Sequence, residues 1–192
     1  MKILYSLAAI TSLLVAAPAS AHAVHTEHMT ISSSFFSGLL HPILGIDHLL
    51  MLAAMGLLIA RQLATTAKVT LSTIALANLT IGLGAGYLFG GFASMEIMIA
   101  LSLVVSAVLL CSPENTFKPW SSSLTALCFG LLAMHGYAHG VEASGHIVGF
   151  GAGMFVSAAV LIVLSHRIGG VVSSRWASWS IAAGSLLFVA LS

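Results

Sequence analysis

The chain of 192 residues is 59% hydrophobic and only 6% charged, with a formal net charge of +1. Soluble domains carry about a quarter charged residues, so this composition excludes a soluble globular protein. The six Lys and Arg residues are too few and too scattered to form a nucleic-acid-binding surface. We expect the folded chain to be embedded mainly in membrane lipid.

The N-terminus has the features of a bacterial-type signal peptide over residues 1–21. Lys2 precedes a short apolar run, and Ala-Ser-Ala at 19–21 is a small-x-small cleavage site that leaves His22 as the mature N-terminus. The overlapping triplet Ala-His-Ala would leave Val24 there instead. An uncleaved membrane anchor is the alternative, although the apolar run is short for a span.

Apolar segments follow one another through the rest of the chain. A spanning helix needs about 20 largely apolar residues, which leaves room for six spans and short loops, and none for a separate soluble domain. The sequence therefore predicts an all-α fold, a polytopic membrane helix bundle, as a single transmembrane domain over 22–192. The six transmembrane helices are expected at 35–60, 69–89, 93–111, 120–140, 144–166 and 176–191.

The distribution of Lys and Arg predicts how these helices are oriented. Cytoplasmic loops of membrane proteins are enriched in positive residues. With the processed N-terminus outside, the loops after the first, third and fifth helices are cytoplasmic, and they hold every Lys and Arg of the mature chain: Arg61, Lys68, Lys118, Arg167 and Arg175. This distribution predicts a multi-pass protein of the bacterial inner membrane with both mature termini in the periplasm.

Small residues are frequent within the predicted helices. They allow helix backbones to approach closely where no hydrophobic effect drives association in lipid. Two glycine triplets stand out, Gly82, Gly84 and Gly86 in the second predicted helix and Gly149, Gly151 and Gly153 in the fifth. They predict a compact bundle.

Ionisable residues inside a membrane are costly, and the first concentration of them is His-Pro-Ile-Leu-Gly-Ile-Asp-His at 41–48. On one continuous helix, His41 and His48 would lie on nearly one face, about 10.5 Å apart along the axis, with Gly45 leaving room between them. Asp47 is then either a direct metal ligand or the hydrogen-bond acceptor that sets the tautomer of a histidine ligand. Pro42 either kinks the helix or begins it.

The second concentration is His-Gly-Tyr-Ala-His-Gly-Val-Glu at 135–142. His135, His139 and Glu142 are at i, i+4 and i+7, so one helix would present two imidazoles and a carboxylate on the same face. Alternatively, glycines at 140 and 145 end this helix, which places Glu142 and His146 at its periplasmic mouth.

The predicted topology brings the two motifs together in the outer half of the bundle, where Glu96 and His146 are also expected. Imidazole and carboxylate ligands suit nickel, cobalt, zinc or iron(II), and neither motif contains a cysteine that would favour copper(I). The metal site predicted from the two motifs consists of His41, Asp47, His48, His135, His139 and Glu142. Possible accessory ligands are His22 and His25 at the mature N-terminus, His146 and Glu96.

The two motifs also carry a family resemblance. Both 41–48 and 135–142 resemble the signatures of the HupE/UreJ family of nickel permeases and accessory proteins, and the resemblance extends over essentially the whole chain. It implies nickel uptake or delivery for hydrogenase or urease maturation, with metallochaperones of that maturation as partners. It implies the same six residues as functional positions, and it does not separate nickel from cobalt.

We therefore expect a secondary permease for a divalent transition metal, most of all Ni²⁺, and not an enzyme. Nickel or cobalt is its substrate, no cofactor is permanently bound, and the sequence contains no ATP-binding motif. A haem-binding electron-transfer subunit with axial histidines is the alternative from another class. An intramembrane metallohydrolase is a third, although the sequence lacks His-Glu-x-x-His.

Overall fold

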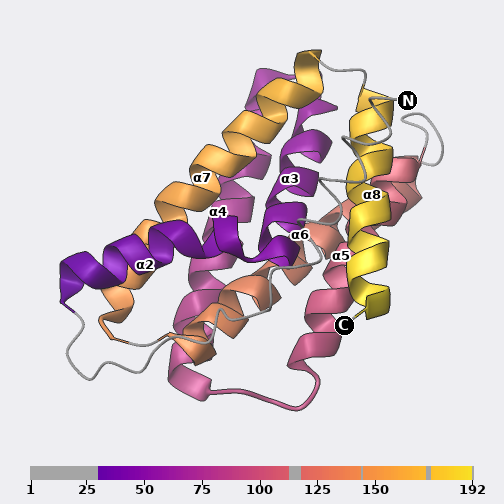
Figure 1. The fold of residues 1–192 in the computed structure, drawn as a ribbon. Coiled ribbons are helices and arrows are strands. Elements are labelled where there is room, and N and C mark those ends of the chain that lie inside the picture. The colour runs from indigo at the N-terminus through magenta and orange to yellow at the C-terminus, as the bar shows by residue number, and fades with distance from the viewer. Residues whose placement is uncertain (1–29, 113–117, 144, 172–173, 192) are drawn as a thin grey trace, which may run out of the picture.

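The computed structural model describes residues 30–112, 118–143, 145–171 and 174–191, and within these ranges every regular element is a helix (Figure 1). The predicted signal peptide, with His22 and His25, lies outside the described residues. The helices are α2 (Ile31–Leu44), α3 (Ile46–Ala60), α4 (Thr65–Phe89), α5 (Met95–Cys111), α6 (Lys118–Glu142), α7 (Ile147–Val171) and α8 (Ser174–Leu191).

The all-α prediction is confirmed, and the protein is a membrane protein. Three helical segments are long and apolar enough to cross a bilayer: α4, residues 123–142 of α6 and residues 147–169 of α7. The pair α2 and α3 meets the same criterion as one bent span, whereas α5 and residues 179–190 of α8 are shorter apolar helices. These six segments coincide in position with the six predicted spans, whose number stays a prediction.

The first predicted span is not one continuous helix, and this expectation was wrong. The chain bends by 76° between α2 and α3, so the first apolar segment consists of two helices. Gly45 separates them in an extended conformation (φ −83°, ψ 113°), while Pro42 stays inside α2. Proline removes a backbone hydrogen-bond donor from the last turn of α2. Glycine has the lowest helix propensity of the residues that retain an N–H. The helix therefore breaks at Gly45, three residues after Pro42.

Helix α3 lies at the centre of the bundle and contacts every other described helix. Beyond its first turn α3 is apolar on all sides, which is typical of a helix surrounded by others, and Met51, Met55 and Ile59 on it are almost completely buried. From α3 to α8 the helices alternate in direction (Figure 1). The central position of α3 brings its first turn, with Asp47 and His48, close to several neighbouring helices.

The guanidinium of Arg61 holds the end of α3 against the end of α5. Its Nη1 donates a hydrogen bond to the Leu109 carbonyl at 2.8 Å, and its Nη2 donates to the Leu110 carbonyl at 2.5 Å. The last carbonyls of a helix lack intrahelical partners, and a cation there also interacts favourably with the helix dipole. This contact sets α5 beside α3.

Helices α4 and α6 pack backbone against backbone through glycines. A methyl group on Gly82 or Gly86 of α4, or on Gly136 or Gly140 of α6, would overlap a carbonyl oxygen of the opposite helix. Gly84 is different, because a methyl group there would meet nothing within 4 Å. Close α4–α6 packing thus accounts for two glycines of the first triplet and for both glycines that follow the histidines of α6.

We predict that Gly86→Ala destabilises the bundle and that Gly84→Ala on the same helix does not. The added methyl at Gly86 meets the Tyr137 carbonyl, and overpacking of this kind costs about 1–3 kcal/mol. The measurement is thermal unfolding of the two purified variants in detergent. The loss expected for Gly86→Ala is about 5 °C in Tm. Equal Tm values would contradict the glycine-mediated contact.

Candidate metal centre

The break at Gly45 brings two histidines of the first motif face to face. His41 lies near the end of α2 and His48 lies in the first turn of α3. Because the chain turns sharply between them, their ring centroids are only 5.5 Å apart. A continuous helix would have separated them by about 10.5 Å along its axis.

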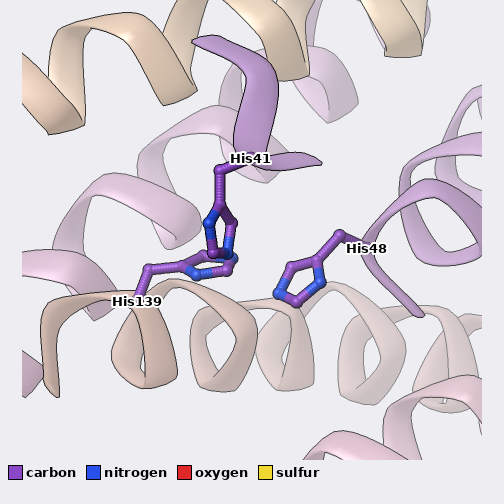
Figure 2. A group of neighbouring side chains, drawn as sticks. All are labelled: His41, His48 and His139. Atoms are coloured by element: carbon purple, nitrogen blue, oxygen red, sulfur yellow. The ribbon is translucent and has the colours of Figure 1, made fainter. Parts of the chain in front are cut away.

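Helix α6 supplies two more histidines to the same place. His135 and His139 are one turn apart and both are almost completely buried. Because Gly136 and Gly140 face α4, the histidines that precede them face the α2–α3 junction. The ring centroid of His139 lies 4.4 Å from that of His41 and 4.1 Å from that of His48, and the three rings converge from three helices (Figure 2).

The side chains form two groups with the spacing of a metal site. One group is His41, His48 and His139, and the other is Asp47, His48 and His135. In each group, one potential ligand atom from every residue lies within 4.8 Å of the others. His48 belongs to both groups, so two three-ligand positions overlap at a single imidazole.

Asp47 orients His48. Its Oδ1 accepts a hydrogen bond from Nδ1 of His48 at 2.6 Å. A carboxylate only accepts, so Nδ1 carries the hydrogen, and in the neutral form of the ring Nε2 keeps its lone pair. His48 Nε2 is buried without a hydrogen-bond partner among the described residues. The contact has the geometry of a carboxylate that sets the tautomer of a metal-binding histidine.

The remaining wall of this centre is apolar. A small cavity is lined by His48, His135 and His139 together with Pro42, Met51, Leu52, Leu79, Leu132, Met154 and Ala158. Such a wall offers no competing hydrogen bonds and keeps the local dielectric constant low, which strengthens the attraction between a bound cation and a carboxylate.

Glu142, His146 and Glu96 lie outside both three-residue groups, and each is exposed. Glu142 is the last residue of α6, and Gly145, which precedes α7, has a positive φ of 83°. The backbone N–H of His146 donates to Ser34 Oγ at 3.0 Å, which ties the start of α7 to α2. Helix α6 thus ends before Gly145 and His146, although it continues through Gly140.

Ser102 is a polar contact of the centre that the sequence did not indicate. It lies on α5, is fully buried, and its Oγ is 2.7 Å from Nε2 of His135. A second buried serine, Ser106, follows one turn later on the same apolar helix, and no motif distinguishes the two in the sequence. The distinction depends on which turn of α5 faces α6.

The comparisons with known proteins point to one family. A family model described as HupE / UreJ protein matches residues 10–191, nearly the entire chain. No curated protein and no solved structure matches significantly. Both histidine motifs fall within the matched range.

We predict that Gly45→Ala impairs the centre without preventing folding. The backbone angles of Gly45 are open to alanine, but the new methyl would lie 2.6 Å from Nδ1 of His48 and 3.3 Å from Oδ1 of Asp47. The ring must move away from its carboxylate, and loss of such a supporting contact lowers metal affinity about 10- to 100-fold. The measurement is metal binding to the purified protein by chelator competition.

The control for this variant is Gly130→Ala on α6, where a methyl group would meet nothing within 4 Å. Wild-type affinity in Gly45→Ala would show that the Asp47–His48 contact does not support binding.

Proposed function

Because the chain belongs to the HupE/UreJ family, whose members are associated with nickel and cobalt transport, we propose that it is a secondary permease that carries Ni²⁺ across the bacterial inner membrane. The ion is captured from the periplasm and released to the cytoplasm. Its destination is hydrogenase or urease maturation, and metallochaperones of these pathways are the proposed partners.

The observation that carries this proposal is the convergence of four imidazoles and a carboxylate inside an apolar bundle. Ring centroids 4.1–5.5 Å apart connect His41 and His48 with His135 and His139, and Asp47 is hydrogen-bonded to His48. Burying such groups costs several kcal/mol unless they are paired or bound to a cation. A divalent metal ion satisfies the nitrogen lone pairs that face the centre.

The donor atoms favour borderline transition metals. Neutral imidazoles with one carboxylate suit Ni²⁺, Co²⁺ and Zn²⁺, whereas Mg²⁺ and Ca²⁺ prefer oxygen ligands alone. Neither three-residue group contains a cysteine thiolate, which a soft ion such as Cu⁺ would favour. Family membership favours nickel and cobalt within this set, and Co²⁺ is the alternative substrate of the same architecture.

The two overlapping groups provide successive positions for the ion. His139 is nearer than His135 to the end of α6 by four residues, or about 6 Å along the helix axis. With that end of α6 toward the periplasm, the ion first meets His41, His48 and His139, and then Asp47, His48 and His135. His48 stays within reach throughout, and the carboxylate enters as the ion moves deeper and loses more of its water.

The haem alternative is disfavoured by the spacing of the rings. The centroids of His48 and His139 are 4.1 Å apart, so these imidazoles are in contact and leave no space for a macrocycle between them. We therefore expect no Soret band in the purified protein. A stoichiometric Soret band would contradict this expectation and favour the haem-binding function over nickel transport.

We predict that His48→Ala abolishes nickel accumulation, because His48 is the one residue common to both groups. The measurement is uptake of radioactive nickel by cells that express either the wild type or the variant at matched membrane abundance. We expect at least a tenfold loss of accumulated nickel, because neither group keeps its three ligands without His48. Cobalt and zinc as competitors rank the ions.

His166→Ala is the matched control, since His166 lies near the C-terminal end of α7 and belongs to neither three-residue group. It should accumulate nickel like the wild type. Equal accumulation by the wild type, His48→Ala and cells without the protein would contradict nickel transport.

A further inference from the structure

Ser102 connects α5 to the buried imidazole of His135. Its Oγ lies 2.7 Å from Nε2 of His135 and 2.6 Å from the backbone carbonyl of Ile99. Both side chains are almost completely buried. Helix α5 contributes no residue to either three-residue group, and Ser102 links this helix to His135 by a hydrogen bond.

The number of hydrogen atoms decides which group donates. A serine hydroxyl has one hydrogen, and a backbone carbonyl only accepts, so the Ser102 hydrogen is used in the bond to Ile99. The Oγ then accepts the Nε2 hydrogen of His135. With its proton on Nε2, a neutral His135 has its lone pair on Nδ1.

The opposite assignment fails on the other side of the ring. If Ser102 donated to Nε2, the proton of His135 would be on Nδ1. That atom is buried and has no hydrogen-bond partner in the described part of the chain. A buried donor without an acceptor is costly, whereas an unprotonated Nδ1 is what a metal ion requires.

We propose that Ser102 is a positioning residue of the metal centre, which holds His135 in the tautomer and orientation that present Nδ1 as the ligand atom. This inference rests on the proposed metal transport. The Ser102–His135 hydrogen bond plays the same part as the Asp47–His48 hydrogen bond. In the group of Asp47, His48 and His135, each histidine is held by a hydrogen bond on one ring nitrogen and offers the other nitrogen to the metal ion. His48 offers Nε2, and His135 offers Nδ1.

A direct test reads the tautomer of the metal-free wild type. Nitrogen-15 NMR of histidine-labelled protein separates protonated from unprotonated ring nitrogens, and the signals of His135 are identified by their loss in His135→Ala. The expected result is a protonated Nε2 and an unprotonated Nδ1. A protonated Nδ1 would overturn the proposal. Because this measurement uses the metal-free protein, its outcome does not depend on metal transport.

A second test measures nickel uptake by Ser102→Ala, with Ser106→Ala as the matched control. Ser106 is equally buried on α5 and donates to the Leu103 carbonyl at 2.8 Å, whereas Ser102 is the one of the two whose Oγ lies within hydrogen-bond distance of His135. We expect Ser102→Ala to raise the KM for nickel about 10- to 100-fold and Ser106→Ala to leave it unchanged. Equal effects of the two variants on KM would overturn the positioning role and show that Ser102 contributes only to packing.

The double variant Ser102→Ala/His135→Ala separates positioning from independent action. If Ser102 acts through His135, removing it adds nothing once the imidazole is gone, so the two effects are not additive. Additive losses overturn the proposal. Wild-type protein that neither binds nor transports nickel overturns the proposed function, whereas active wild type with a normal Ser102→Ala overturns the positioning role alone.

Discussion

A polar group inside a membrane has no water to bind, so its partners must come from the protein or from its cargo. The first helical segment meets this constraint at its break. Where α2 and α3 part at Gly45, the chain turns by 76° and brings His41 back beside His48, while Asp47 accepts the Nδ1 hydrogen of His48. One small residue allows this, because a side chain at Gly45 would collide with the imidazole it adjoins. The candidate metal centre depends on that bend, because the bend places His41 beside His48.

Helix α6 serves the same centre through two adjoining faces. Gly136 and Gly140 let its backbone rest against that of α4, and the histidines one position before each of them project toward the α2–α3 junction. Packing and ligand placement are therefore coupled. The α4–α6 interface fixes the position of α6 relative to α4, and with it the position of the imidazoles of His135 and His139. Proteins that bind metal in helix bundles place ligands from facing helices in this way, and here the small residues supply the close approach.

Transport requires a site that binds an ion and also releases it. Two overlapping groups around His48 meet this requirement more readily than one closed cage would, because the ion can exchange ligands one at a time. The supporting hydrogen bonds keep each ring ready: Asp47 acts on His48, and Ser102 acts on His135. Apolar side chains line the cavity beside His48, His135 and His139, so an ion there would interact mainly with the imidazoles.

By itself the sequence determined the class of the protein, the positions of its apolar segments and its family. Composition and hydropathy report which segments prefer lipid, and the motifs at 41–48 and 135–142 are local in the chain. Periodicity along one helix was misleading where the helix is not continuous, so the true approach of His41 to His48 could not be predicted. The exposure of Glu142 and the contact of Ser102 with His135 also came only from the tertiary structure. The physical reason is common to all three: they depend on how helices bend and which turns face each other, and close backbone packing decides that between residues far apart in the sequence.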